Sequence, residues 1–186
     1  MSQLLEDDQN LLLQTARSAV RAYLSGLSPQ LPRVDSGILL ETRALFVTLH
    51  LGQRLRGCIG NIHPTGPLYR SAAECAISAA VNDPRFAPLT LSELDGVNFE
   101  ISVLSPMEAV SGPEEIEVGT HGLLISKGQA RGLLLPQVGS EYKWDRERFL
   151  SETCRKAGLR PDDWKQGAFI QRFTAHVFSE QRIHVS

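Results

Sequence analysis

The stretch LFVTLHLGQRLRGCIGNI, residues 45 to 62, decides the fold because it holds the clearest strand pattern in the chain. Over residues 45 to 51, aliphatic side chains alternate with polar or aromatic ones, as they do in a half-buried strand. The Gly-Gln pair at 52 and 53 can turn the chain back into a second strand over residues 55 to 62. The stretch therefore predicts an antiparallel hairpin.

Helices are predicted before and after this hairpin in the sequence. Apolar residues recur at three- and four-residue steps over residues 7 to 24, which predicts an amphipathic helix that ends at Gly26. A second, Ala-rich helix follows the hairpin, where Thr65 or Gly66 can cap its start and Pro84 ends it. The hairpin therefore has helices available to cover one of its faces.

A further strand follows the second helix. Thr90 and Glu93 have the spacing of a capping box, which predicts a helix of one or two turns. Residues 97 to 104 then alternate apolar and polar side chains before Ser105 and Pro106 end the pattern. We interpret this segment as a third strand of the same sheet.

After Pro106 the sequence changes to short segments separated by glycines. Residues 122 to 138 predict two strands around a Lys127-Gly128 turn, and Asp145 can cap a helix that ends at Gly158. Residues 168 to 178 carry aromatic side chains on both faces, which predicts a central strand that returns to the first sheet.

These elements predict one α+β domain with a largely antiparallel or mixed sheet and flanking helices. We expect a larger lobe of about residues 1 to 106 plus 166 to 186, and a smaller lobe of about residues 107 to 165. Runs of strands interrupted by single helices are typical of this class, whereas a parallel sheet needs regular strand-helix alternation.

Composition excludes several classes of protein. The 19 basic and 21 acidic residues give a net charge of -2, without the basic patches of a nucleic-acid-binding protein. No apolar stretch approaches a membrane span, and acids stand at the N-terminus where a secretory signal needs bases, so we expect a cytoplasmic protein. The three cysteines lack C-x-x-C spacing, which favours free thiols over disulfides or zinc. No sequence motif indicates a cofactor.

The segment RLRGCIGNIHP, residues 54 to 64, is the main candidate site. Strand alternation places Arg54, Arg56 and Cys58 on one face, and nearby cations lower the pKa of a thiol. Cys58 is then a candidate nucleophile. The alternative is a small buried side chain, because free cysteine is among the most buried residue types. A metal site of Cys58 with His63 lacks a further ligand at a suitable spacing.

Four other polar residues are weaker candidates. Asp83 and Arg85 lie in the loop NDPRFAPL, which either presents them to a ligand or simply ends the helix with a surface ion pair. Glu100 occupies a polar position in the alternating pattern of its strand, and it is either a general base or a solvated side chain. His121, in VGTHG, could reach the edge of a cleft or belong to a plain turn. Cys75 and Cys154 read as core.

Five motifs in order resemble the AMMECR1 family, and the resemblance runs from about Leu11 to about Glu180. The motifs are LRGCIG at 55–60, DPRF at 83–86, ISVLSP at 101–106, GLLI with RGLLLPQV at 122–138, and FLSETCRKAGL at 149–159. The resemblance implies an α+β protein of two lobes, with LRGCIG lining a cleft between them. Asp83, Arg85 and Glu100 also match the family pattern.

The resemblance does not imply an established reaction. Bacterial and archaeal members are similar to one component of a three-part system with a Memo-like protein and a radical SAM protein, which implies those two partners. Function therefore has to be inferred from the chemistry of the site itself.

Two functions fit the sequence. In the first, an enzyme, Cys58 attacks a small polar substrate, Arg56 stabilises negative charge, and Glu100 or His63 moves a proton. In the second, a non-catalytic module binds an anionic ligand or a partner's segment, and Cys58 only packs. The residues that we expect to contact the bound molecule are Arg56, Gly57, Gly60, Asp83, Arg85 and His121.

Overall fold

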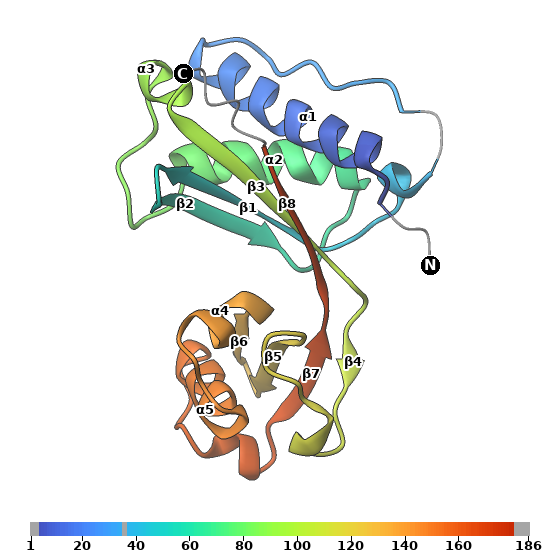
Figure 1. Ribbon diagram of the computed structural model, residues 1–186, viewed down its shortest axis with the longest axis vertical. Helices are drawn as coiled ribbons and strands as arrows, with labels where there is room; N and C mark the ends of the chain where they lie inside the picture. The colour runs from blue at the N-terminus through green and yellow to red at the C-terminus, as the bar shows by residue number, and fades with distance from the viewer. Residues whose placement is uncertain (1–3, 35–36, 181–186) are drawn as a thin grey trace. The chain divides into compact units, whose positions relative to one another are not determined.

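The computed structural model describes residues 4–34 and 37–180, and the chain divides into two compact units. The first unit is Met1–Val103 with Val177–Ser186, and the second is Leu104–His176. Each unit is built on a four-stranded sheet (Figure 1). The α+β class with antiparallel strand pairs is therefore confirmed.

The predicted hairpin forms the first unit's sheet together with two more strands. β1 (Leu45–Leu51) pairs antiparallel with β2 (Arg54–Asn61) on one side and with β3 (Val97–Leu104) on the other. β8 (Ala175–Ser179) completes the order β2-β1-β3-β8. Leu45, Val47 and Leu49 are fully buried, so this face of β1 is the core face that the alternation predicts.

Two helices cover this core face. α1 (Glu6–Leu24) and α2 (Leu68–Val81) share one hydrophobic cluster with β1 and β3 (Figure 1). α2 begins after Pro67 without a side-chain cap, so the expected caps at Thr65 or Gly66 are wrong. The predicted capping box is confirmed in the short α3 (Leu91–Leu94), where Thr90 and Glu93 bond reciprocally.

β2 contains glycine at positions 57 and 60 because a side chain there would collide with its neighbours. A Cβ at Gly57 would collide with the backbone carbonyl oxygen of Ala79 in α2. At Gly60, the added Cβ would collide instead with the ring of Phe46. β2 therefore reaches the helix layer because Gly57 has no side chain, and this close approach is one of the uses of glycine in a strand.

The second unit has its own sheet and helices. Its strands are β4 (Glu108–Ala109), β5 (Gly122–Lys127), β6 (Ala130–Leu134) and β7 (Phe169–Phe173), in the order β4-β7-β5-β6. Asp145 caps α5 (Arg146–Lys156) as predicted, through its side chain and the Arg148 N–H. The sequence prediction missed α4 (Pro136–Glu141), whose first three residues fall within the segment assigned to strands.

The predicted final strand over residues 168 to 178 is wrong as a single element. β7 lies inside the second sheet, whereas β8 is the edge strand of the first. The ladder breaks at Thr174, whose N–H and C=O bond to Ser105. Phe169 is 54% exposed and Val177 is 43% exposed, so the two-sided aromatic pattern does not mark a covered strand.

Three single turns of 3-10 helix complete the described elements: Ile38–Leu40, Pro113–Glu115 and Asp163–Lys165. In the described part of the chain, no helix is both long and apolar enough to cross a membrane.

Candidate functional site

Cys58 lies in a polar row that crosses three strands of the first sheet. Thr48 of β1 stands opposite Cys58 of β2 and opposite Glu100 of β3. The Thr48 hydroxyl donates a hydrogen bond to Cys58 Sγ at 3.3 Å. Since Val47 and Leu49 point into the core, alternation places this row on the sheet face that turns away from the helices.

Asp83 fixes the backbone of the motif. Its side chain is 2% exposed, and its Oδ2 accepts a hydrogen bond from the Cys58 N–H at 2.9 Å. Oδ1 accepts from the Arg85 backbone N–H at 3.1 Å. The carboxylate therefore ties the loop after α2 to the middle of β2, which an exposed ion pair would not do.

Arg85 completes this arrangement. Its Nε and Nη2 donate to the two oxygens of Asp83 at 2.9 and 2.6 Å, and Nη2 also reaches the Cys58 carbonyl at 3.3 Å. The hydrogen bond from Arg85 holds the pKa of Asp83 well below its usual range. The Arg85 side chain is 52% exposed, so the cationic partner of this pair borders solvent while the Asp83 side chain is buried.

Burial dominates the electrostatics of the Cys58 thiol. Loss of solvent raises its pKa, while the Thr48 hydrogen bond and the Arg85 charge act in the opposite direction. The charges of Asp83 and Glu100 raise it further. The thiol is therefore favoured over the thiolate, contrary to the expectation of an activated nucleophile.

The expected role of Arg54 and Arg56 is also different in the structure. The β1–β2 register shifts between Leu49 and His50, so the strict alternation that placed Arg56 beside Cys58 is interrupted. Arg56 instead pairs with Glu93 at 3.3 Å, and Arg54 is exposed. Arg85, which is remote from the motif in sequence, is the cation that acts on the thiol.

The remaining predicted residues divide between this row and other places. Glu100 is half-buried in the row, and Gly60 follows Cys58 on β2 opposite Phe46. His63 is exposed just past the end of β2, where its backbone N–H bonds to Asn61. His121 belongs to the second unit, where its Nδ1 accepts from the Glu117 N–H at 3.0 Å. The predicted position of the motif in a cleft between lobes stays a prediction.

Sequence reasoning missed Thr48, the direct partner of the Cys58 thiol. A regular hairpin around Gly52 and Gln53 would place Val47 opposite Cys58, and the register shift between Leu49 and His50 brings Thr48 there instead. No sequence pattern predicts this shift. Cys75 and Cys154 are buried as expected, at 5% and 0% exposure. Over residues 4–34 and 37–180, no three His, Cys, Asp or Glu side chains are grouped so that they could hold a metal ion.

Comparisons with known proteins bear on the whole chain. The family model that matches is AMMECR1, over residues 13–178. A protein of Pyrococcus abyssi is 42% identical, with 97% of this chain and 94% of that protein covered. A protein of Methanothermobacter thermautotrophicus is 43% identical, with 95% and 96% covered. The crystal structure of an uncharacterised protein from Pyrococcus horikoshii matches with a TM-score of 0.86 at 43% identity, and the match covers 91% of this chain and 90% of that one.

Proposed function

Since the chain belongs to the AMMECR1 family, we propose a function from the geometry of its own motif residues: the first unit binds a small anionic molecule at Arg85, beside Cys58. The observation that carries the proposal is the orientation of the Asp83–Arg85 pair. The Asp83 side chain is 2% exposed and the Arg85 side chain is 52% exposed, so an approaching ligand meets the cationic partner.

The guanidinium retains capacity for a ligand. Both Asp83 oxygens are occupied by N–H donors of Arg85 and of the Cys58 backbone. Among the described residues, Arg85 Nη1 has no hydrogen-bond partner, while Nε and Nη2 are held in place by Asp83. A fixed guanidinium edge of this kind favours carboxylate or phosphate groups, which accept from planar N–H pairs.

The thiol fits a binding role better than a covalent one. A thiolate is the reactive species, and burial raises the pKa of Cys58. The Thr48 hydroxyl donates a hydrogen bond to Sγ, which holds the Cys58 side chain in place within the polar row. Cys58 then contributes packing and its carbonyl contact with Arg85, and Glu100 limits the site to ligands that tolerate a carboxylate nearby.

Calorimetric titration with citrate and with inorganic phosphate tests the anion site. We expect Arg85→Gln to weaken binding roughly tenfold or more, since a charge-assisted contact is lost. Arg70→Gln is the matched control, because it removes an exposed arginine on α2 that does not contact the motif. Equal affinities for the two variants would reject Arg85 as the binding residue.

A second candidate is the enzyme in which Cys58 is a nucleophile. It is favoured by one observation: Thr48 and Arg85 both act to lower the pKa of Cys58, and this thiol is only half-buried. Alkylation by iodoacetamide at neutral pH, followed by intact-mass spectrometry, separates the two functions. Selective modification of Cys58 before Cys75 and Cys154 favours the enzyme, whereas equal protection until unfolding leaves only the binding role.

A further inference from the structure

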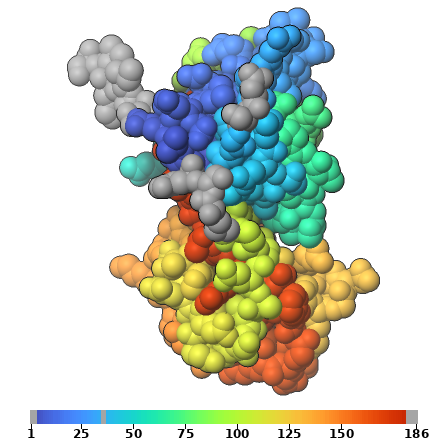
Figure 2. Space-filling model, turned by 90° about the vertical axis from the view of Figure 1, so that its right-hand side faces the viewer, coloured from blue at the N-terminus to red at the C-terminus, as the bar shows by residue number. Residues whose placement is uncertain are grey.

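The polar row on the first sheet contains a carboxylate to which the proposed anion site gives no partner. Phe99 and Ile101 are fully buried in the core, so alternation along β3 turns the Glu100 side chain to the opposite face. α1 and α2 cover the core face, and the N-terminal half of α1, in dark blue, forms part of the molecular surface (Figure 2). Glu100 therefore shares its face of the sheet with the Cys58 thiol.

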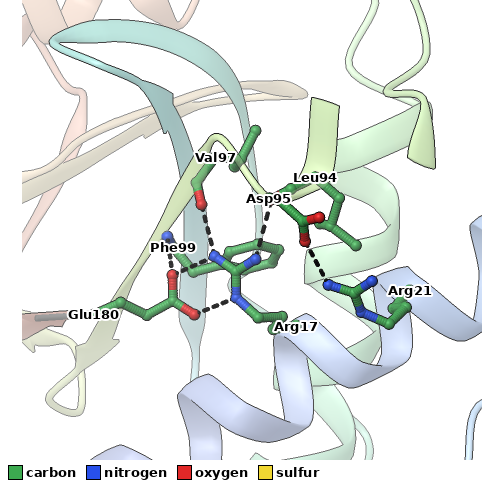
Figure 3. A network of polar contacts seen from close by, with 7 residues as sticks. All are labelled: Arg17, Arg21, Leu94, Asp95, Val97, Phe99 and Glu180. Carbon is green, nitrogen blue, oxygen red and sulfur yellow. Dashed lines mark hydrogen bonds and ion pairs between the residues drawn. The ribbon is translucent and has the colours of Figure 1, made fainter. Parts of the chain in front are cut away.

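The Glu100 carboxylate is available to a ligand. It is half-buried, and among the described residues it has no hydrogen-bond or ionic partner. Glu180, next to β8, is half-buried as well, but its oxygens accept from Arg17 Nε and Nη2, each at 2.6 Å, and from the Phe99 N–H at 3.0 Å (Figure 3). A carboxylate that loses water without gaining a donor is unfavourable, so Glu100 would gain from a cationic partner.

Arg85 borders the same thiol from the edge of β2. Its Nη2 lies 3.3 Å from the Cys58 carbonyl oxygen, and the hydrogen bond to Asp83, together with the Cys58 side chain, raises the pKa of the guanidinium. Besides the dominant effect of burial, the Arg85 charge lowers the pKa of the thiol and the Glu100 charge raises it. The thiol therefore lies between a cation at the strand edge and an anion further into the sheet.

The strand register sets the spacing of these two charges. Cys58, Thr48 and Glu100 stand opposite one another on three adjacent strands. Because neighbouring strands are about 4.8 Å apart, the backbones at Cys58 and Glu100 are separated by about 10 Å. A simple anion at Arg85 would leave Glu100 without a partner, whereas an elongated molecule with a cationic second end would satisfy both charges.

We infer that the ligand of the proposed anion site is a small, extended zwitterion, whose carboxylate or phosphate binds Arg85 and whose ammonium group binds Glu100. The inference rests on the proposed function, because it keeps Arg85 as the anion-binding residue. An ammonium group donates three hydrogen bonds and suits a carboxylate acceptor. Glu100 then determines specificity, since it attracts the ammonium end and repels ligands that carry only negative charge.

Titration with triglycine, followed by ¹H–¹⁵N NMR, tests the inference with a zwitterion that extends to about 10 Å. The backbone amide signals of Cys58 and Glu100 are expected to shift. N-acetyltriglycine lacks the ammonium charge and triglycine amide lacks the carboxylate, so each should bind roughly tenfold more weakly than triglycine. The absence of a saturable shift with triglycine would overturn the inference.

Glu100→Gln distinguishes the zwitterion from the anion site itself. The variant should bind triglycine roughly tenfold more weakly, but it should bind N-acetyltriglycine at least as well as the native chain does, because the repelling charge is gone. If the native chain binds both peptides equally and Arg85→Gln weakens both, the inference is overturned and the anion site stands. If Arg85→Gln weakens neither peptide, both proposals are overturned.

Glu74→Gln is the matched control for Glu100→Gln. It removes the same charge from an exposed position on α2, which packs against the other face of the sheet. The control should leave the affinity for triglycine unchanged. Equal weakening by the two variants would indicate a general attraction of the ammonium group to an acidic protein, and this result would also overturn the inference.

Discussion

Two arginine–carboxylate pairs organise the first unit, and they differ mainly in sequence separation. Asp83 and Arg85 are two residues apart, whereas Arg17 and Glu180 are 163 residues apart. In the first pair the Asp83 side chain is buried and the Arg85 side chain is 52% exposed. In the second pair both partners are about three-quarters buried, at 26% and 21% exposure.

The difference indicates what each pair does. Asp83 serves a local purpose, because it pins the Cys58 N–H and orients a solvent-facing guanidinium. Glu180 joins segments that are distant in the sequence. Its Oε2 also accepts a hydrogen bond from the Phe99 N–H, and its own N–H donates to the Phe99 carbonyl, so the end of β8 is tied to β3. The local pair therefore presents charge, and the distant pair joins chain segments.

The largest effect is expected from Asp83→Asn. The substitution leaves a buried amide against Arg85 and the Cys58 N–H, and breaking a buried, hydrogen-bonded ion pair costs about 3 kcal/mol of unfolding free energy. Asp95→Asn, in an exposed pair with Arg21, should change it by less than about 0.5 kcal/mol. Both tryptophans lie in the second unit, so hydrogen exchange of β1 and β2 amides is the suitable measurement.

The pH dependence of stability provides a second test of the Asp83 carboxylate. The pKa of Asp83 is lowered in the folded state, so its stabilisation is fully present above the unfolded value of about 4. It is lost as pH falls through the lower folded value. The stability gap between the native chain and Asp83→Asn should therefore stay constant from pH 7 to about 5 and narrow below about 4. A gap that widens on acidification would contradict the assignment.

Gly57→Ala tests the motif strand independently of charge. Because the new Cβ would meet the Ala79 backbone, which cannot move like a side chain, we expect a loss of about 2 kcal/mol. Gly66→Ala is the control, since its Cβ would lie 3.7 Å from Arg70 Cδ, an ordinary contact. Thermal unfolding followed by far-UV circular dichroism compares the two, and equal midpoints would refute the close approach.

A double-mutant cycle measures the distant pair. Arg17→Gln and Glu180→Gln should show a coupling energy of about 1.5 kcal/mol, because both charges are shielded from solvent. Arg21→Gln with Asp95→Asn, at 50% and 77% exposure, should couple by about 0.3 kcal/mol. Urea denaturation of the four single and two double variants provides both numbers. Similar coupling energies in the two cycles would show that the Arg17–Glu180 pair does not join the two segments more strongly than an exposed surface pair does.

Thr48→Val should have the smallest effect on stability. It removes one neutral hydrogen bond to sulfur while keeping the shape of the side chain, so the expected loss is below about 1 kcal/mol. The pKa of Cys58 should rise, because the Thr48 bond lowers it in the native chain. Ultraviolet absorbance of the thiolate against pH measures this change. A lower pKa in the variant would exclude Thr48 as the donor.

The sequence by itself determined the elements that depend on local pattern. Strand alternation and a Gly-containing turn predicted β1 and β2, and the same pattern predicted β3 within its observed bounds. Asp145 and Thr90 were identifiable as helix caps, because capping depends on residues within one turn. The sequence also placed Cys58, Asp83, Arg85 and Glu100 among the candidates. The structure brings Asp83 and Arg85 into contact with the Cys58 backbone and places Glu100 in the same cross-strand row.

Tertiary structure alone decided which cation faces the thiol and where the last strands belong. Alternation pointed to Arg56, but a shift in register sends it to Glu93 and leaves Arg85 beside Cys58. β7 and β8 read as one strand because side-chain pattern does not record which sheet a strand joins. The pair of Glu180 with Arg17 is likewise not predictable from local pattern. A contact across 163 residues depends on how the sheet is assembled, and no local interaction encodes it.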